Sequence, residues 1–270
     1  MARIRVACQT YTWEMLGDAW QGQPTDLLDL IAAAGYEGVE ITNTMIGDFA
    51  GRPAEFADEL RRRELRLACF AYASPTGFTD PDRAEADLAG ACEALAFVSH
   101  FPEPRLGLGG AAHPSRGNLC AKLDQAIGFY NQIGRLGAQQ GVSVNVHPHS
   151  HFGSLLESAD EYAYLLDRLN PEWVSFGPDT GHIVRGGQEL LACLQRHISR
   201  ITHLHLKDTS ADGTWQPLGQ GVCDLPTVLH LLEEAGYDGW VVAEEESEAA
   251  RSDGFAAICR NREYLRGLGY

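Results

Sequence analysis

Four residues of types that bind divalent metal ions stand at the ends of four successive apolar segments. They are His147, Asp179, His205 and Glu244. Two imidazoles with two carboxylates suit Mn²⁺, Co²⁺, Fe²⁺ or Zn²⁺ better than Ca²⁺. Four protein ligands also leave coordination positions open for a substrate that chelates the ion. The pattern therefore predicts one divalent metal ion, with Mn²⁺ as first choice and Co²⁺, Fe²⁺, Zn²⁺ or Mg²⁺ as alternatives.

The alternation of side chains places these residues on equivalent faces of their segments. In VNVHPHS, His147 and His149 share one face while valines occupy the other. In ITHLHLKD, His205 and Lys207 lie opposite two leucines. Side chains alternate between the two faces of a strand, and active sites of parallel barrels form at the carboxyl ends of the strands. We therefore expect the four candidate ligands to converge at one barrel mouth.

Burial of these four groups together would be unfavourable without a cation. Buried carboxylates and imidazoles lose hydration, and the two carboxylates repel one another. A divalent cation offsets both effects. A metal ion is therefore the favoured interpretation, and a metal-free hydrogen-bonded network at the barrel mouth is the alternative.

Eight apolar segments alternate with helical ones along the chain, which predicts βαβ units and a parallel sheet. The predicted strands cover residues 3–9, 37–42, 65–72, 105–109, 142–149, 173–179, 201–207 and 239–245. The predicted helices lie near residues 25–35, 53–64, 80–98, 118–140, 158–169, 187–197, 224–236 and 253–267. Ser158 and Glu161 predict a capping box at one helix start. The 270 residues suit a single (β/α)₈ TIM barrel domain, residues 1–270.

Composition excludes several classes of partner. The formal net charge of −16 disfavours nucleic acid and anionic membrane surfaces, because binding to phosphates depends on Lys and Arg. The sequence contains no apolar run long enough to predict a membrane span, so we expect a cytoplasmic protein. The seven cysteines are scattered and form no C-x-x-C pair, which argues against a disulfide framework. A homo-oligomer is left open.

Several motifs resemble the sugar phosphate isomerase/epimerase superfamily of xylose isomerase-like barrels. These are PDTGH, HLHLKD, PLGQG and the G-Y-D-G-x-x-x-x-E ending, and the resemblance covers essentially all eight units. It implies a metal held by residues at the ends of strands five to eight, commonly Glu, Asp, His and Glu. Carried over, the Asp of D-x-x-H is Asp179, the second His of H-x-H is His205, and the final Glu is Glu244.

The chain departs from this family pattern on strand five, where VHPH puts His147 in place of the usual Glu. This His, the TYTWEM segment and the pair Glu244 and Glu246 are similar to myo-inosose (2-keto-myo-inositol) dehydratases. The resemblance implies dehydration of an inosose-type keto-polyol. The expected course is proton abstraction next to the carbonyl and a metal-stabilised enediolate.

The ligand on strand five decides how many bases remain. Epimerases and isomerases of the family resemble two-base enzymes that use metal-bound glutamates on strands five and eight. A metal-bound His147 has no free lone pair on its coordinating nitrogen, so one base is lost. One base with a general acid is sufficient to remove a proton and expel a β-hydroxyl. A metal-dependent lyase is therefore favoured.

Further residues near the predicted strand ends are candidates for contact with a small carbohydrate-like substrate. His149 or Glu246 is the candidate base, and His182 is the candidate proton donor or substrate-orienting group. Lys207 and Asp208 are expected to contact the substrate or to support the ligands of the metal ion. A structural ion pair is the alternative for Lys207.

Aromatic and acidic residues near other strand ends have two interpretations each. Trp13, Tyr72 and Trp215 are expected to wall a sugar ring, with core or lid packing as the alternative. Glu14 and Glu40 are interpreted either as binding substrate hydroxyls or as simply exposed to solvent.

Other activities remain open. A ketose 3-epimerase or an aldose–ketose isomerase, acting on a sugar or hydroxypyruvate, would use the same enediolate. A lyase acting on a 3-keto-glycoside would share the elimination chemistry. An abasic-site endonuclease would need three metals and a basic surface, which the charge disfavours. A non-catalytic sugar-binding barrel is the remaining class.

Overall fold

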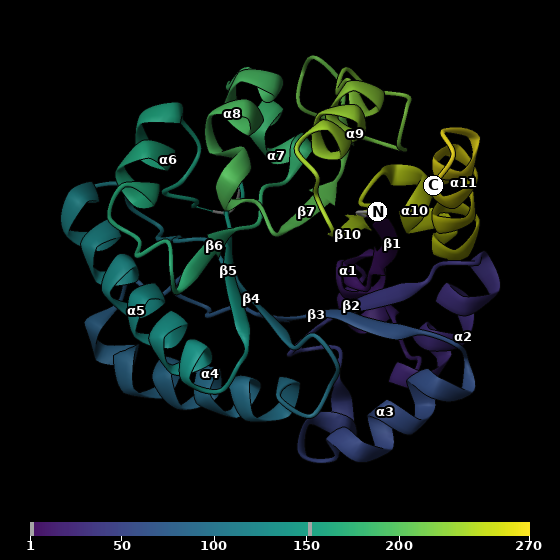
Figure 1. Ribbon diagram of the computed structural model, residues 1–270, viewed down its shortest axis with the longest axis horizontal. Coiled ribbons are helices and arrows are strands. Elements are labelled where there is room, and N and C mark those ends of the chain that lie inside the picture. The colour runs from purple at the N-terminus through teal and green to yellow at the C-terminus, as the bar shows by residue number, and fades with distance from the viewer. Residues whose placement is uncertain (1–2, 151–152) are drawn as a thin grey trace.

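The computed structural model describes residues 3–150 and 153–270 (Figure 1). Its centre is a parallel sheet of eight strands in the order β6-β5-β4-β3-β2-β1-β10-β7. The strands are β1 (Ile4–Gln9), β2 (Gly38–Thr42), β3 (Arg66–Tyr72), β4 (Arg105–Gly109), β5 (Ser143–His147), β6 (Val174–Phe176), β7 (His203–Leu206) and β10 (Gly239–Ala243). Two parallel bridges, Phe176 to Ile201 and Asp179 to His205, close the ring between β6 and β7. The predicted (β/α)₈ TIM barrel is therefore confirmed.

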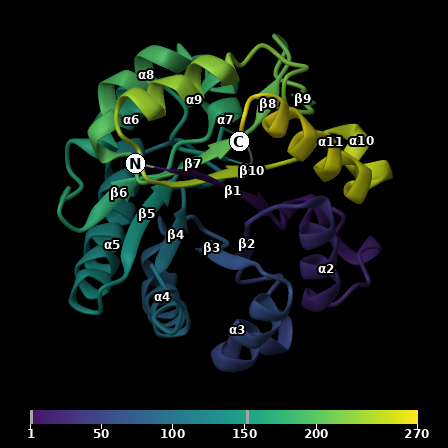
Figure 2. The same ribbon diagram turned by 45° about the vertical axis from the view of Figure 1, so that its right-hand side comes forward.

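Helices surround this sheet in Figures 1 and 2. The outer helices are α2 (Pro24–Ala34), α3 (Pro53–Arg62), α4 (Ala84–Val98), α5 (Leu119–Gln139), α6 (Ala159–Leu166), α8 (Leu190–His197), α9 (Leu225–Glu234) and α11 (Gly254–Gly267). Each corresponds to one predicted helical segment. Ser158 is the N-cap of α6, and Glu161 completes the expected capping box. The described helices include none that is long and apolar enough to cross a membrane.

Short elements that the sequence did not reveal lie next to the strand ends. The helices are α1 (Tyr11–Glu14), α7 (Thr180–Arg185) and α10 (Glu248–Ser252), and the antiparallel strands are β8 (Asp208–Thr209) and β9 (Trp215–Gln216). Short 3₁₀ turns cover Gly17–Ala19, Gly47–Gly51, Pro81–Arg83 and Ile198–Arg200. The predictions of strands over 142–149 and 173–179 were too long, because the chain leaves the sheet after His147 and Phe176. These departures begin the loops that carry the candidate site.

The outward faces of the strands pack closely on the helix layer. Val144 and Val174 are fully buried beneath α5. Two glycines of α5 allow this approach, since a Cβ at Gly134 would overlap Val174, and one at Gly137 would lie 2.6 Å from Val144 Cγ2. The helix is thus seated directly on β5 and β6, which fixes the direction in which these strands present their ends.

Candidate active site

The structure brings the four candidate ligands together at the carboxyl end of the barrel. One ligand atom from each of His147, Asp179, His205 and Glu244 lies within 4.8 Å of the others. The Asp179 to His205 bridge that closes the barrel sets two of these side chains beside each other. Convergence from four strand ends makes this group a candidate metal centre.

The imidazole of His147 is oriented by the backbone. Its Nδ1 lies 2.9 Å from the carbonyl oxygen of Gly177, which can only accept, so Nδ1 carries the hydrogen. Its Nε2 is buried and has no hydrogen-bond partner among the described residues. Burial, together with the positive His205, lowers the pKa of His147 to about 3. The ring therefore presents a neutral, unpaired nitrogen to the quartet.

Asp179 presents a second buried atom without a partner. Its Oδ1 caps helix α7 by accepting from the backbone N–H of His182 at 2.8 Å. No described residue hydrogen-bonds to its Oδ2. Burial and the nearby Glu244 raise the pKa of Asp179 to about 7. An unsatisfied buried polar atom costs about 1–3 kcal/mol, and a divalent cation between Asp179 Oδ2 and His147 Nε2 would satisfy both atoms. The residues present thus fit a metal ion.

His205 lies between two carboxylates. Its Nδ1 is 2.5 Å from Oε2 of Glu244, and its Nε2 is 3.0 Å from Oε1 of Glu40. Burial alone would lower the pKa of His205, but the two carboxylates raise it well above its usual value. Glu40 is only 3% exposed and also accepts from His203 at 2.5 Å. The exposed alternative considered for Glu40 is therefore wrong.

Lys207 is an ion-paired residue of the barrel interior. Its ammonium group contacts Glu246 and lies 2.9 Å from Oε1 of Glu244. It also sits 4.1 Å from the ring centre of Trp215 and 3.4 Å from Nε2 of His182. Burial would lower the pKa of Lys207, but the carboxylates raise it instead. Lys207 therefore holds the two glutamates of the β10 end in place, as the ion-pair alternative expected.

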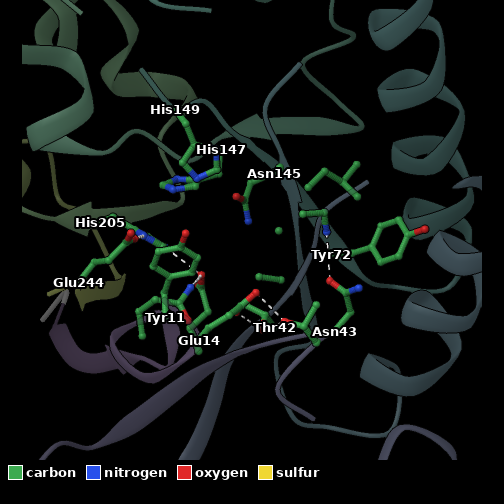
Figure 3. Close-up of a pocket in the computed structure, with 18 of the residues that line it drawn as sticks. Tyr11, Glu14, Thr42, Asn43, Tyr72, Asn145, His147, His149, His205 and Glu244 are labelled. Carbon is green, nitrogen blue, oxygen red and sulfur yellow. Dashed lines mark hydrogen bonds and ion pairs between the residues drawn. The ribbon is translucent and has the colours of Figure 1, made fainter. Parts of the chain in front are cut away.

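A cavity of about 170 Å³ opens beside the quartet (Figure 3). It is lined by His147, His205 and Glu244, and by the candidate bases His149 and Glu246. Burial raises the pKa of Glu246 to about 7. The cavity thus joins three of the four candidate ligands to both candidate bases, whereas His182 is not among its lining residues.

The aromatic candidates are placed differently from one another. Tyr72 lines the cavity. Trp215 lies behind it, with its ring centre 4.9 Å from that of His182. Trp13 is 3% exposed and packs against Trp20, with 6.0 Å between ring centres. Although Tyr72 borders the cavity, its hydroxyl donates to the carbonyl of Asp87 on α4, and its ring points away from the cavity (Figure 3).

Asp208 organises the PLGQG loop. Its carboxylate accepts from the backbone N–H groups of Thr209, Gly219, Gly221 and Cys223, at 2.9 to 3.0 Å. A Cβ at Gly221 would overlap this carboxylate. The glycine is thus required for the backbone to fold around Asp208, which accounts for the motif without a phosphate ligand.

The first half of the barrel supplies pocket residues that sequence reasoning missed. Tyr11, Thr42, Asn43 and Thr44 line the cavity together with Glu14. Each lies at or just after the end of β1 or β2, as active-site residues of this fold do. The polar run TNT at the end of a buried strand was the available signal.

Comparison with known proteins agrees with this architecture. A family model described as xylose isomerase-like TIM barrel matches residues 28–266. The inosose dehydratase of Geobacillus thermodenitrificans (strain NG80-2) is 33% identical over 161 residues, 53% of each chain. The match to this relative thus spans about half its length. The inosose dehydratase of Mesomycoplasma hyopneumoniae (strain 7448) is 27% identical over 265 residues, which cover 88% of this chain and 86% of that one.

A solved structure shows the same fold. The crystal structure of IOLI protein with a zinc atom superposes with a TM-score of 0.81 at 13% identity, over 98% of this chain and 97% of that one. The likeness extends over the whole barrel, and the family model covers nearly all of the same length. The chain belongs to the xylose isomerase-like TIM barrel family.

Proposed function

We propose that the protein is a divalent-metal-dependent lyase that removes water from an inosose-type keto-polyol. The observation that carries this proposal is the state of His147. Its Nδ1–H is committed to the Gly177 carbonyl, and its Nε2 faces the quartet. A ligand bound in this way cannot accept a proton. The site therefore favours one-base elimination over two-base epimerisation, and the relatives named inosose dehydratase support the substrate class.

The ion would be held by Nε2 of His147, Oδ2 of Asp179, Nδ1 of His205 and a carboxylate oxygen of Glu244. When bound, it supplies a Lewis acid that polarises the substrate carbonyl and stabilises the charge developing on its oxygen. The donor set accommodates Mn²⁺ and Zn²⁺ alike. Mn²⁺ remains our first choice, and the zinc atom of the IOLI structure makes Zn²⁺ the metal to compare with it.

Glu246 is the preferred base of this reaction. It lines the cavity, Lys207 holds its carboxylate, and burial raises its pKa to about 7, near the pH at which a general base works best. Glu246 removes the proton from the carbon beside the carbonyl. The electron pair forms a carbon–carbon double bond as the neighbouring C–O bond breaks. The hydroxyl takes up a proton and leaves as water, and the enol product becomes a diketone.

His149 is our candidate for supplying the proton to the leaving hydroxyl, and His182 is the buried ring next to it. His149 lines the cavity, and its ring centre lies 5.0 Å from that of His182. The backbone N–H of Ser150 donates to Nδ1 of His182 at 3.0 Å, and Nε2 of the same ring lies 3.4 Å from the ammonium group of Lys207. His149 is also the alternative base if Glu246 is the donor.

The test is product analysis with protein loaded with Mn²⁺ or Zn²⁺ and supplied with 2-keto-myo-inositol. The proposal predicts a product lighter by one water molecule. A product of unchanged mass would instead identify an epimerase or isomerase. Release of an aglycone from a 3-keto-glycoside, without turnover of the keto-inositol, would identify the other lyase activity. Full turnover after complete removal of metal would exclude the proposed chemistry.

A further inference from the structure

The cavity has a second polar end, built from β1 and β2. There the hydroxyls of Thr42 and Thr44 donate to the two carboxylate oxygens of Glu14, each over 2.6 Å. The two hydroxyl oxygens are themselves 2.8 Å apart. Figure 3 shows Glu14 and Thr42 across the cavity from His147. This polar end is therefore distinct from the candidate metal quartet, although both face the same space.

Glu14 is held ready to accept further hydrogen bonds. A carboxylate offers about four lone-pair sites and no donor when ionised. The two threonines use one site on each oxygen, and they fix the carboxylate without neutralising its charge. The remaining sites suit the hydroxyl hydrogens of a polyol, and a charged acceptor makes such bonds stronger than a neutral one does.

The charge of the cavity wall discriminates between classes of substrate. The described residues that line it include four glutamates and no arginine or lysine. The nearby ammonium of Lys207 is engaged by Glu244 and Glu246. At the Glu14 end a phosphate or carboxylate group would meet like charge, and the described lining residues offer it no arginine or lysine as a partner, which is a means of rejecting wrong ligands.

A buried amide between the two ends also points to a hydroxyl ligand. Asn145 is fully buried and lines the cavity, yet its Oδ1 has no hydrogen-bond partner in the described parts of the chain. A Cβ at Gly177 would overlap this oxygen, so the glycine leaves the amide its room. An unpaired buried acceptor is unfavourable, and a hydroxyl donor from a ligand would satisfy it.

We propose that Glu14, fixed by Thr42 and Thr44, determines substrate specificity by binding the neutral hydroxyls of a polyol. It holds the part of the substrate remote from the reacting carbonyl, and with the other glutamates it excludes phosphorylated or carboxylated sugars. The assignment of the remote end rests on the proposed function. The preference for an uncharged polyol does not depend on any turnover.

Binding of unreactive ligands tests the proposal separately from the dehydration. Calorimetry on the metal-loaded protein would compare myo-inositol with myo-inositol 1-phosphate. We expect the neutral polyol to bind at least tenfold more tightly. Glu14→Gln should weaken its binding about tenfold or more, and Glu14→Lys should shift the preference towards the phosphate. Glu172→Gln makes the same change on the exposed surface and should leave both affinities unchanged.

A second pair of variants tests whether the threonines hold Glu14. Thr44→Val removes the exposed hydroxyl at nearly constant volume, and Thr44→Ser retains it. We expect a several-fold loss of myo-inositol binding in the first variant and recovery in the second. Equal binding of the phosphate and the neutral polyol to the wild type, no binding of the polyol, or wild-type affinity in a folded Glu14→Gln variant would each overturn the proposal. Intact discrimination without any dehydration would reject the proposed function alone.

Discussion

Glu40 and His205 form a buried pair in which a carboxylate oxygen lies 3.0 Å from Nε2 of the imidazole. Gln9 donates to the same oxygen at 2.6 Å and helps to fix the carboxylate. With Nε2–H directed at Glu40, Nδ1 is the nitrogen directed at the quartet. A carboxylate behind a ligating histidine orients the ring and increases its basicity.

Glu40→Gln should weaken metal binding without abolishing the fold. Loss of such an outer partner typically reduces metal affinity about 10–100-fold, and we expect a reduction of that order. Competition with a chromophoric chelator would measure the dissociation constants for Mn²⁺ and Zn²⁺. Glu172→Gln is again the control, and an unchanged affinity in a folded Glu40→Gln protein would contradict the role given to Glu40.

Asp179→Asn separates the ligand role of Asp179 from its role as a helix cap. Asn caps a helix about as well as Asp, so α7 should remain capped and the melting temperature should change little. The negative charge on the buried oxygen is lost, and the purified variant should therefore contain much less than one metal ion per chain. Elemental analysis would settle this, since a full complement of metal would remove Asp179 from the ligand set.

Metal affinity should rise with pH. The carboxylates that raise the pKa of His205, and the burial that raises that of Asp179 to about 7, favour the protonated forms near neutral pH. A cation must displace these protons, so binding releases them and weakens as the pH falls from 8 to 6. Calorimetry in buffers of different ionisation enthalpy would count the protons, and binding without proton release would be inconsistent with this coupling.

Glu246→Gln should reduce turnover about 10²–10⁴-fold, the usual contribution of a general base, while metal content is retained. Glu248→Gln, two residues further along and exposed, is the matched control. Steady-state kinetics with 2-keto-myo-inositol would compare them. If His149→Asn abolishes turnover and Glu246→Gln does not, the base is His149.

Gly134→Ala should destabilise the barrel by about 1–3 kcal/mol, because the added methyl overlaps Val174 in a closely packed layer. Gly128→Ala lies in the same helix with nothing within 4 Å of the new Cβ. It should stabilise the protein by about 0.5–1 kcal/mol through helix propensity. Urea denaturation would give both values, and equal effects would show that helix propensity, not packing, determines the role of Gly134.

The inward-facing polar residues on the second half of the barrel could be predicted because strand alternation is local. His147 and His205 each stand on the face opposite a run of buried aliphatic residues, which the sequence displays directly. Asp179 follows a strand of three residues, and its place beside His205 depends on the closure of the barrel. That closure follows from the fold as a whole and not from any local pattern.

The Glu14 end of the cavity could not be predicted in the same way. Thr42 and Thr44 reach Glu14 from a different strand end, and only tertiary structure shows that the three side chains bond to one another. Aromatic residues have a similar ambiguity, since Trp13 lies just after β1 and Tyr72 ends β3, yet Trp13 packs in the core and the hydroxyl of Tyr72 donates to Asp87 of the helix layer. Side-chain direction beyond the last residue of a strand is determined by loop conformation.

The strands β6 and β7 are paired by isolated bridges, and one of these bridges joins Asp179 to His205. An ion bound by both side chains would link the ends of β6 and β7. Metal binding would then stabilise the barrel where its backbone hydrogen bonding is sparse. A substrate that chelates the ion would stabilise the same pair of strands further. The stability of the barrel and its catalytic activity would thus depend on the same link between β6 and β7, and a variant that weakens this link would lose both.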